Sequence, residues 1–330
     1  KKDSADGRFL MWKITTKAIQ KQPITGTSLG GFPAAYAETQ AEYMASGKAT
    51  EQEKLVAGCP EYAFNEYLQI GLEQGLVGLA LFIGWLGLLF YKGIKNKRYA
   101  CCGGLMSLAI FAFSSYPLQL PEFWVVLIFL GVMSVTPDKD EIRENQAESN
   151  GHRWGKQIFF MGIAILGIGL FWMQKDHYKA YQQWNKAQMF YNNKAYEAAL
   201  EVYEPLYPLL KHKPEFLFEA AQSLSKTGQY EKANEYLERA VLLSSDPMLY
   251  YVMAKNEQCL GEYRQAEKHL LHAIDILPER IYPYYLLMNL YTEPSYFQPA
   301  KLKMAIDSVL TKKPKVESSA IKEMKEKARS

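Results

Sequence analysis

The sequence predicts an all-α protein in which about four transmembrane helices are followed by a C-terminal solenoid of paired helices. Two observations predict this architecture. Long stretches with almost no charge lie between residues 67 and 174, whereas the two flanks hold most of the charged side chains. A short pattern then recurs four times after residue 175, at intervals near 34 residues. We expect three regions: an N-terminal loop region over 1–67, a membrane block over 68–174 and a repeat domain over 175–330.

The composition excludes several classes of protein. A chain of 330 residues is too long for one small domain. Its 48% hydrophobic and 22% charged residues exclude a wholly disordered chain, and the mean hydropathy of −0.22 averages an apolar middle with polar ends. The net charge is only +3 and no basic run carries interleaved aromatics, so we expect no nucleic-acid partner. The four cysteines show no paired C-x-x-C spacing, and we expect no metal and no cofactor.

The membrane block contains four apolar segments. A spanning helix needs about 20 mostly apolar residues, because the hydrocarbon core is about 30 Å thick and a helix rises about 1.5 Å per residue. The segments cover about 75–91, 99–120, 123–135 and 157–174. The third is short and spans only if flanking residues lie in the interface. A buried core of apolar helices in a soluble protein is the alternative, which the alternating loop charge disfavours.

The loop charges predict the orientation of these helices. The loop after the first segment, Lys92–Arg98, holds four basic residues, and the loop after the third, Lys139–Lys156, is basic again. The link around Pro117–Pro121 contains no Lys or Arg. Excess Lys and Arg stay in the cytoplasm, so both basic loops should be cytoplasmic and both large flanks periplasmic.

The C-terminal region repeats itself. An aromatic residue recurs with steps of 34, 33 and 34 residues, and an alanine three residues later follows the same steps. The aromatic series is Tyr196, Tyr230, Tyr263 and Phe297, and the alanine series is Ala199, Ala233, Ala266 and Ala300. Over about 180–312 the pattern resembles the tetratricopeptide repeat (TPR), a pair of antiparallel helices that stacks on its neighbours. Pro214, Pro247 and Pro278 fall between the units, where a helix must stop.

The TPR resemblance implies a protein partner, held in the concave groove of the solenoid. Residues 175–330 contain 22 Lys and Arg against 20 Asp and Glu, so the overall charge selects neither an acidic nor a basic partner. The aromatic stripe of such repeats is more often core than binding surface, and fold alone does not establish a ligand.

The N-terminal region should begin with a helix capped by Ser4 or Asp6 and ended by Pro23. The glycine-containing turn GTSLGGF follows, and then a polar helix from about Pro33 to Met44. A further helix should start near Pro60 and run into the first spanning segment. The chain opens at Lys1 without a methionine or signal segment, and we expect it to be a fragment of a longer protein.

In order and spacing, residues of about 4–135 resemble the O-antigen ligase and polymerase family of bacterial inner-membrane glycosyltransferases. The matching residues are Arg8, Trp12, Pro23, Gly26, Gly30, Phe32, Tyr36, Asn65, Leu68, Glu73 and Gly75. Two positions depart from the family pattern. Ser28 stands where a glycine is common, and Phe64 stands where many ligases have a histidine that is assigned as general base.

The resemblance implies transfer of a glycan from an undecaprenyl pyrophosphate carrier to a glycan, lipid or protein acceptor at the periplasmic face of the membrane, without a metal. Arg8 would contact the pyrophosphate, because its guanidinium is a permanently charged fork. With Phe64 in place of the histidine, the base should be a carboxylate beside Asn65, either Glu66 or Glu73. These lie two helical turns apart on one face, and we favour Glu66 because Glu73 can serve as a helix anchor.

Simpler roles exist for the same residues. An arginine at a helix start is often a solvated surface residue, Glu66 can be a surface charge and Asn65 a helix cap. Trp12, Gly26, Gly30 and Phe32 are expected to be structural parts of the motif. The alternative hypothesis is therefore a membrane-anchored TPR scaffold protein without catalytic activity. Ligases, polymerases and protein-glycosylating members share these motifs, so the acceptor stays open.

Overall fold

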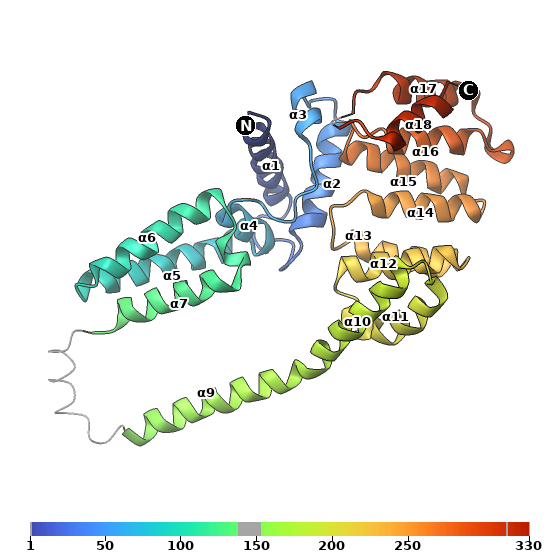
Figure 1. Ribbon diagram of the computed structural model, residues 1–330. Helices are drawn as coiled ribbons and strands as arrows, with labels where there is room; N and C mark the ends of the chain where they lie inside the picture. Colours follow the sequence, from blue (N-terminus) through green and yellow to red (C-terminus); the bar gives the residue numbers. More distant parts are fainter. Residues whose placement is uncertain (1, 138–152, 315, 330) are drawn as a thin grey trace. The chain divides into compact units, whose positions relative to one another are not determined.

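The computed structural model describes residues 2–137, 153–314 and 316–329, and within these residues every regular element is a helix (Figure 1). The all-α prediction is confirmed for this part of the chain. The first half contains α1 (Lys2–Lys21), α2 (Phe32–Ala45), α3 (Glu51–Val56), α4 (Glu66–Glu73), α5 (Gly75–Lys95), α6 (Tyr99–Ser114), η1 (Pro117–Gln119) and α7 (Pro121–Val135). The second half contains α9 (Arg153–Met173), α10 (Lys175–Asn192), α11 (Tyr196–Leu210), α12 (Pro214–Lys226), α13 (Tyr230–Val241), α14 (Met248–Cys259), α15 (Tyr263–Ile276), α16 (Tyr282–Tyr291), η2 (Pro294–Tyr296), α17 (Pro299–Thr311) and α18 (Ser319–Lys327).

The contacts divide the chain into two compact units. The bundle unit comprises residues 22–26 and 62–182, and the repeat unit comprises residues 1–21, 27–61 and 183–330. The contacts thus group much of the N-terminal region with the repeats. The expected division into 1–67, 68–174 and 175–330 stays a prediction.

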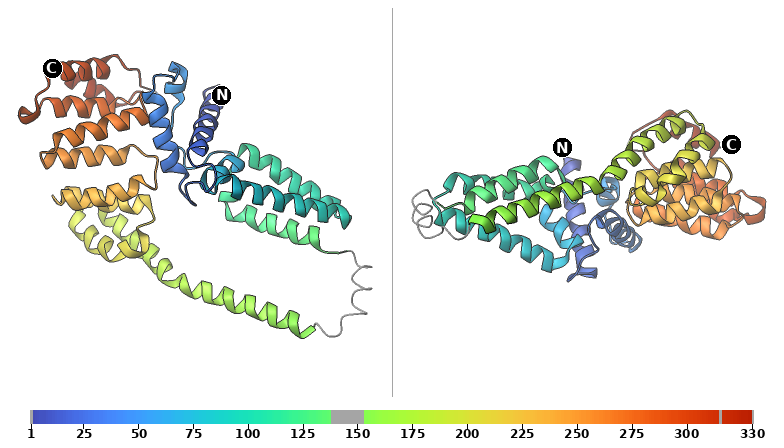
Figure 2. Two further views of the ribbon diagram at one scale, coloured as in Figure 1. Left: turned by 180° about the vertical axis from the view of Figure 1, so that it is seen from behind. Right: turned by 90° about the horizontal axis from the view of Figure 1, so that it is seen from below.

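Within the bundle unit, α5, α6 and α7 lie side by side (Figures 1 and 2). Of the residues that the structure describes, only the 21-residue α5 forms a helix both long and apolar enough to cross a membrane. The apolar helices α6 and α7 have 16 and 15 residues and are shorter than a full span. The structure therefore supports one membrane-crossing helix by length and composition, and the expected number of four is not established.

The three helices pack through small residues and point large apolar side chains outward. A side-chain carbon added to Gly93 would lie 2.6 Å from Cys102 Sγ, and one added to Gly104 would lie 3.0 Å from a methyl group of Leu130. Large residues such as Val125 and Ile110 are more than half exposed on the outer faces. This arrangement, with small residues inside and apolar ones outside, is typical of helices packed in lipid.

The two ends of this bundle differ chemically. At one end the α5–α6 connection lies beside the end of α7, where the Asn96 amide donates to Ser134 O at 3.1 Å and Arg98 donates to Pro137 O at 3.2 Å. This is the end that carries the basic loop Lys92–Arg98. Residues 139–152 of the second predicted basic loop, Lys139–Lys156, lie outside the described residues. The opposite end carries η1 and the start of α5.

In the repeat unit, helices stack in antiparallel pairs in the order of the sequence (Figure 1). The predicted aromatics Tyr196, Tyr230 and Tyr263 are the first residues of α11, α13 and α15. The three alanines that follow them are all fully buried, as close packing of paired helices requires: Ala199, Ala233 and Ala266. For these three units, the repeat period of about 34 residues is confirmed, and so is the close helix packing at the alanines that explains it.

The fourth unit departs from the predicted register. Phe297 is 58% exposed and Ala300 is also exposed, whereas Ala305 and Val309 are buried in their place. The reason is that α17 begins only at Pro299, after the short helix η2. The aligned alanine therefore falls in the first turn of α17, and the contact with α16 is made further along the helix.

Replacing Ala233 with leucine should overpack the α12–α13 pair and lower the free energy of unfolding by about 1–3 kcal/mol. Ala300→Leu is the matched control: Ala300 is exposed, so a change within about 0.5 kcal/mol is expected there. Chemical denaturation of both variants measures the difference. Equal stabilities would show that the buried positions of the repeats are misassigned.

The N-terminal helices differ from the predicted ones in several respects. Helix α1 begins at Lys2, before the predicted caps. Helix α3 was not predicted, although Thr50 and Glu53 form a capping box whose two hydrogen bonds are both present. The helix expected from Pro60 starts instead at Glu66 and is interrupted at Gln74.

Helix α2 packs against α15 and so joins the N-terminal segment to the repeats. The Gln40 side chain is fully buried, and its amide donates to Ile276 O at 2.8 Å and to Gly58 O at 3.0 Å. Further along, Ser245 Oγ donates to Pro60 O at 3.2 Å. The extended segment that follows α3 is therefore held on the solenoid by hydrogen bonds to its backbone.

Candidate functional site

The residues predicted for the site are divided between the two units. Asn65, Glu66, Glu73 and Gly26 belong to the bundle unit. The others belong to the repeat unit: Arg8, Trp12, Gly30 and Phe32. We describe each set by itself.

The start of α4 is built around Asn65. This residue is buried, and its side-chain Oδ1 accepts a hydrogen bond from Leu68 N–H at 3.1 Å, which caps the helix. Phe64, at the position of the expected histidine, has a φ of +50°. Its ring lies edge-on to Tyr116 at 4.8 Å, and Tyr116 stacks on Tyr62 at 5.2 Å. A cluster of three aromatic rings thus lies at the position where the resemblance implies a histidine.

Glu66 is only 1% exposed and connects α4 to η1. Leu118 N–H donates to Oε1 of Glu66 at 2.6 Å, and the Gln119 amide donates to Oε2 at 3.3 Å. Burial raises the pKa of Glu66 above its ordinary value, and the nearby charge of Glu73 adds to this, although the two donors oppose it. Both carboxylate oxygens therefore already accept hydrogen bonds from the protein.

Glu73 is positioned by a short hydrogen-bonded chain. Ala63 N–H donates to Oε1 of Gln69 at 2.7 Å, which fixes the orientation of that amide. The Gln69 Nε2 group then donates to Oε1 of Glu73 at 2.9 Å. Glu73 is 8% exposed and is the last residue of α4. The structure thus brings Asn65, Glu66 and Glu73 together on one short helix, as the spacing predicts.

Two glycines allow the turn Pro23–Gly26 to contact the α4–α5 junction directly. Gly26 and Gly75 have φ values of +68° and +69°. A side-chain carbon on Gly26 would lie 2.5 Å from the backbone of Glu73, and one on Gly75 would lie 2.0 Å from Ile24 O. Leu76 N–H also donates to Pro23 O at 2.7 Å. Two separate parts of the motif, the glycine turn and the Glu-x-Gly segment, therefore meet at one end of α5.

The rest of the glycine turn lies in the repeat unit. Gly30 has a φ of +76° and open space around its α-carbon, so its backbone conformation alone explains the glycine. Phe32 is fully buried at the start of α2 and stacks on Tyr36 at 5.6 Å. The structural roles expected for Gly30 and Phe32 stay predictions.

Ser28, which stands where the family pattern often has a glycine, has a φ of +85°, a backbone conformation that favours glycine. Ser28→Gly should therefore stabilise the protein by about 1 kcal/mol, because a side chain is disfavoured in this conformation. Ser4→Gly, in the helical backbone of α1, should instead destabilise it by up to about 1 kcal/mol. Thermal unfolding compares the two, and equal shifts would contradict the role of the backbone at position 28.

Arg8 and Trp12 lie one turn apart on α1, as predicted. Arg8 is exposed, and the Trp12 ring lies edge-on to Phe9 at 6.0 Å. The buried residues of this helix are on another face and include Leu10 and Ile14. Within the described residues, no group of three or more His, Cys, Asp or Glu side chains is arranged to hold a metal ion.

Residues 1–83 match a protein-family model described as O-antigen ligase. Residues 192–273 match the model of anaphase-promoting complex, cyclosome, subunit 3. No curated protein matches the chain. The resemblance predicted from the sequence is therefore confirmed for the N-terminal part, and the C-terminal part is TPR-like.

Three solved structures similar to this chain have sequence identities of 17–19%. MamA 41-end from Desulfovibrio magneticus RS-1 is 17% identical, with a TM-score of 0.36 over 46% of this chain and 78% of that one. The Yersinia enterocolitica type III secretion chaperone SycD, in complex with a peptide of the translocator YopD, is 19% identical, with a TM-score of 0.31 over 38% and 90%. A Podosopora anserina putative kinesin light chain with TPR-like repeats is 17% identical, with a TM-score of 0.36 over 46% and 85%.

Proposed function

We propose that this protein is a membrane glycosyltransferase of the O-antigen ligase and polymerase type. It would transfer a glycan from an undecaprenyl pyrophosphate carrier to a glycan, lipid or protein acceptor. The observation that carries the proposal is the buried carboxylate pair Glu66 and Glu73 beside the Gly26–Gly75 contact, at the end of an apolar helix, within the segment that matches the family model. In this proposal the repeat unit binds a protein partner.

The proposed topology places α5, α6, α7 and α9 across the bacterial inner membrane. The basic loop Lys92–Arg98 and the η1 turn lie at opposite ends of the bundle formed by α5, α6 and α7. With the basic loop in the cytoplasm, Glu66 and Glu73 lie at the periplasmic end, where a lipid-linked glycan is presented. Cysteine labelling after Lys54 and after Lys226 tests the periplasmic flanks, and labelling from the cytoplasm at either site contradicts this topology.

The proposed reaction is a single displacement. The acceptor hydroxyl oxygen forms a bond to the anomeric carbon of the donor glycan, and the bond from that carbon to the pyrophosphate oxygen breaks. Glu73 takes the proton of the acceptor hydroxyl, and Arg8 offsets the negative charge that grows on the departing pyrophosphate. Glu66 is assigned a positioning role, because both of its oxygens already accept hydrogen bonds from η1. Asn65 caps α4 and so fixes where the helix that carries both carboxylates begins.

The test is Arg8→Ala, with glycan transfer assayed in cells that express the protein. We expect transfer to fall by about 100-fold, because an electrostatic contact to the leaving group is lost. Arg8→Lys should retain part of the activity, since the charge remains without the fork. Arg329→Ala removes the same side chain from an exposed position outside the family match and serves as the control. Unchanged transfer in Arg8→Ala at equal protein level would favour the scaffold hypothesis.

A further inference from the structure

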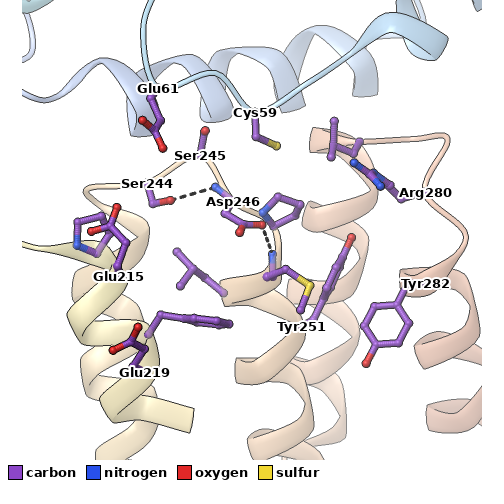
Figure 3. Close-up of a pocket in the computed structure, with 16 residues that line it drawn as sticks. Cys59, Glu61, Glu215, Glu219, Ser244, Ser245, Asp246, Tyr251, Arg280 and Tyr282 are labelled. Carbon is purple, nitrogen blue, oxygen red and sulfur yellow. Dashed lines mark hydrogen bonds between the residues drawn. The ribbon is translucent and has the colours of Figure 1, made fainter. Parts of the chain in front are cut away.

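The repeat unit contains a cavity of about 910 Å³ on the side of the solenoid formed by α12, α14 and α16 (Figure 3). The repeats supply most of its wall, through α12, the 244–247 loop and the first turns of α14 and α16. Leu277 and Arg280, between α15 and α16, also line it. The remaining wall is formed by Cys59 and Glu61, in a segment that is held in place by the hydrogen bond from Ser245 to Pro60. The cavity therefore has walls from two distant parts of the sequence and does not depend on any other unit.

Carboxylates dominate the polar lining of this cavity. Glu61, Glu215 and Glu219 lie toward one side of it in Figure 3, and Arg280 lies on the opposite side. Asp246 is the fourth carboxylate, so four negative side chains face one positive side chain. Residues 175–330 as a whole are nearly neutral, with 22 basic and 20 acidic side chains. The negative charge is thus a local property of the cavity.

The four carboxylates are not equivalent. Glu219 accepts hydrogen bonds from Trp184 at 2.7 Å, Gln188 at 2.9 Å and Tyr203 at 3.0 Å, which gives it a structural role in joining α10, α11 and α12. Asp246 accepts from Met248 N–H at 2.9 Å, in the turn that leads into α14. Glu61 and Glu215 are exposed at the cavity wall. These two are the side chains best placed to pair with a ligand cation.

The floor of the cavity is apolar and aromatic. It contains Phe218, Leu249, Tyr251 and Tyr282, and the two tyrosine rings meet edge to face at 5.2 Å. A lysine or arginine has an aliphatic stem that packs well on such a surface while its charged end reaches a carboxylate. The volume lies in the range of ligand pockets and is too small for a folded domain. A few residues of an extended chain fit both the space and the chemistry.

We propose that this cavity binds an extended, lysine- or arginine-bearing segment of the partner protein. The proposal rests on the proposed partner-binding role of the repeats, and it is independent of glycan transfer. The nearly neutral overall charge of the repeat region does not indicate a basic ligand, whereas the lining of the cavity does. Because Cys59–Glu61 forms one wall, the bound segment contacts both the repeats and the chain that leads into α4.

The probe is a fluorescently labelled eight-residue peptide of alternating Lys and Ser, titrated into the whole protein in detergent and followed by anisotropy. The same peptide with Glu in place of Lys is the charge control. We expect saturable binding of the Lys peptide that weakens as salt rises, and no binding of the Glu peptide. Absence of saturable Lys-peptide binding, or tighter binding of a neutral oligosaccharide, would overturn the proposal.

The variant Glu61→Lys/Glu215→Lys should weaken the Lys peptide about tenfold or more. Glu238→Lys is the matched control, because Glu238 is an exposed residue of α13 that does not line the cavity. Melting curves of each variant check that it is folded. Unchanged affinity in the folded double variant would place the peptide elsewhere. The Arg8 variants test glycan transfer separately. A failure of the peptide-binding proposal can therefore be distinguished from a failure of the proposed catalytic function.

Discussion

Replacing Gly75 with alanine should destabilise the bundle unit by about 3 kcal/mol. Two costs add. A side-chain carbon would lie 2.0 Å from Ile24 O, so the Pro23–Gly26 turn must move away from the α4–α5 junction. The φ of +69° is also a left-handed conformation that costs about 1–2 kcal/mol for a residue with a side chain. Because Glu73 lies two residues before Gly75, its position at the candidate site should change as well.

Gly84→Ala is the control for this variant. Gly84 lies within α5, and an added side-chain carbon would have no atom within 4 Å. Alanine is favoured over glycine in a helix by up to about 1 kcal/mol, so this variant should be as stable as the wild type or more stable. Thermal unfolding in detergent compares the two variants. Similar melting temperatures would show that the turn does not pack on the α4–α5 junction as described.

The contact between Gly26 and Gly75 shows which features of the candidate site could be predicted from the sequence and which could not. Gly26 and Gly75 were identified through the family resemblance, but nothing in the sequence indicated that they contact each other. The apolar pattern also continues through Gln74, so it predicted one helix where the structure has two. The break follows from a backbone contact with residues about 50 positions earlier, which no local periodicity reports.

The repeats illustrate the opposite case. The spacing of Ala199, Ala233 and Ala266 predicted their burial because each contact is made within one helix pair and recurs in the next. The prediction failed at Ala300, where Pro299 delays the start of the helix. At this position the proline determined where the helix starts, and the repeat period therefore no longer predicted which residue is buried. The packing of α2 on α15 was also not predicted, since it joins residues more than 200 positions apart.

The two carboxylates of the candidate site should respond differently to amide substitution. Glu73→Gln should lower glycan transfer by about 100-fold or more, the usual contribution of a general base. Its Oε1 can still accept from Gln69, so the protein level should not change. Glu66→Gln should have a smaller effect on transfer. Its remaining carbonyl oxygen can accept from Leu118 N–H, and the Gln119 amide can turn its own oxygen toward the new NH₂ group.

The positioning role of Glu66 also predicts a pH dependence. Burial raises the pKa of Glu66 in the folded state above the value near 4.5 expected in the unfolded chain. The stability that its protonated form contributes is therefore fully present below about pH 4.5 and is lost as the pH rises through the higher folded-state pKa. Glutamine stays neutral throughout. As the pH rises from 4 to 8, the melting temperature of the wild type should therefore fall relative to that of Glu66→Gln.

These readouts separate the two roles because a catalytic base and a positioning residue affect different measurements. If Glu66 orients η1 and Glu73 takes the proton, Glu73→Gln lowers transfer strongly, while the buried Glu66 carboxyl is still present and still makes melting depend on pH. Glu66→Gln then changes the pH dependence and reduces transfer only modestly. The reverse pattern would assign the base to Glu66, as the sequence alone favoured. Wild-type transfer in both variants would exclude a carboxylate base and leave Arg8 and departure of the pyrophosphate as the basis of the reaction.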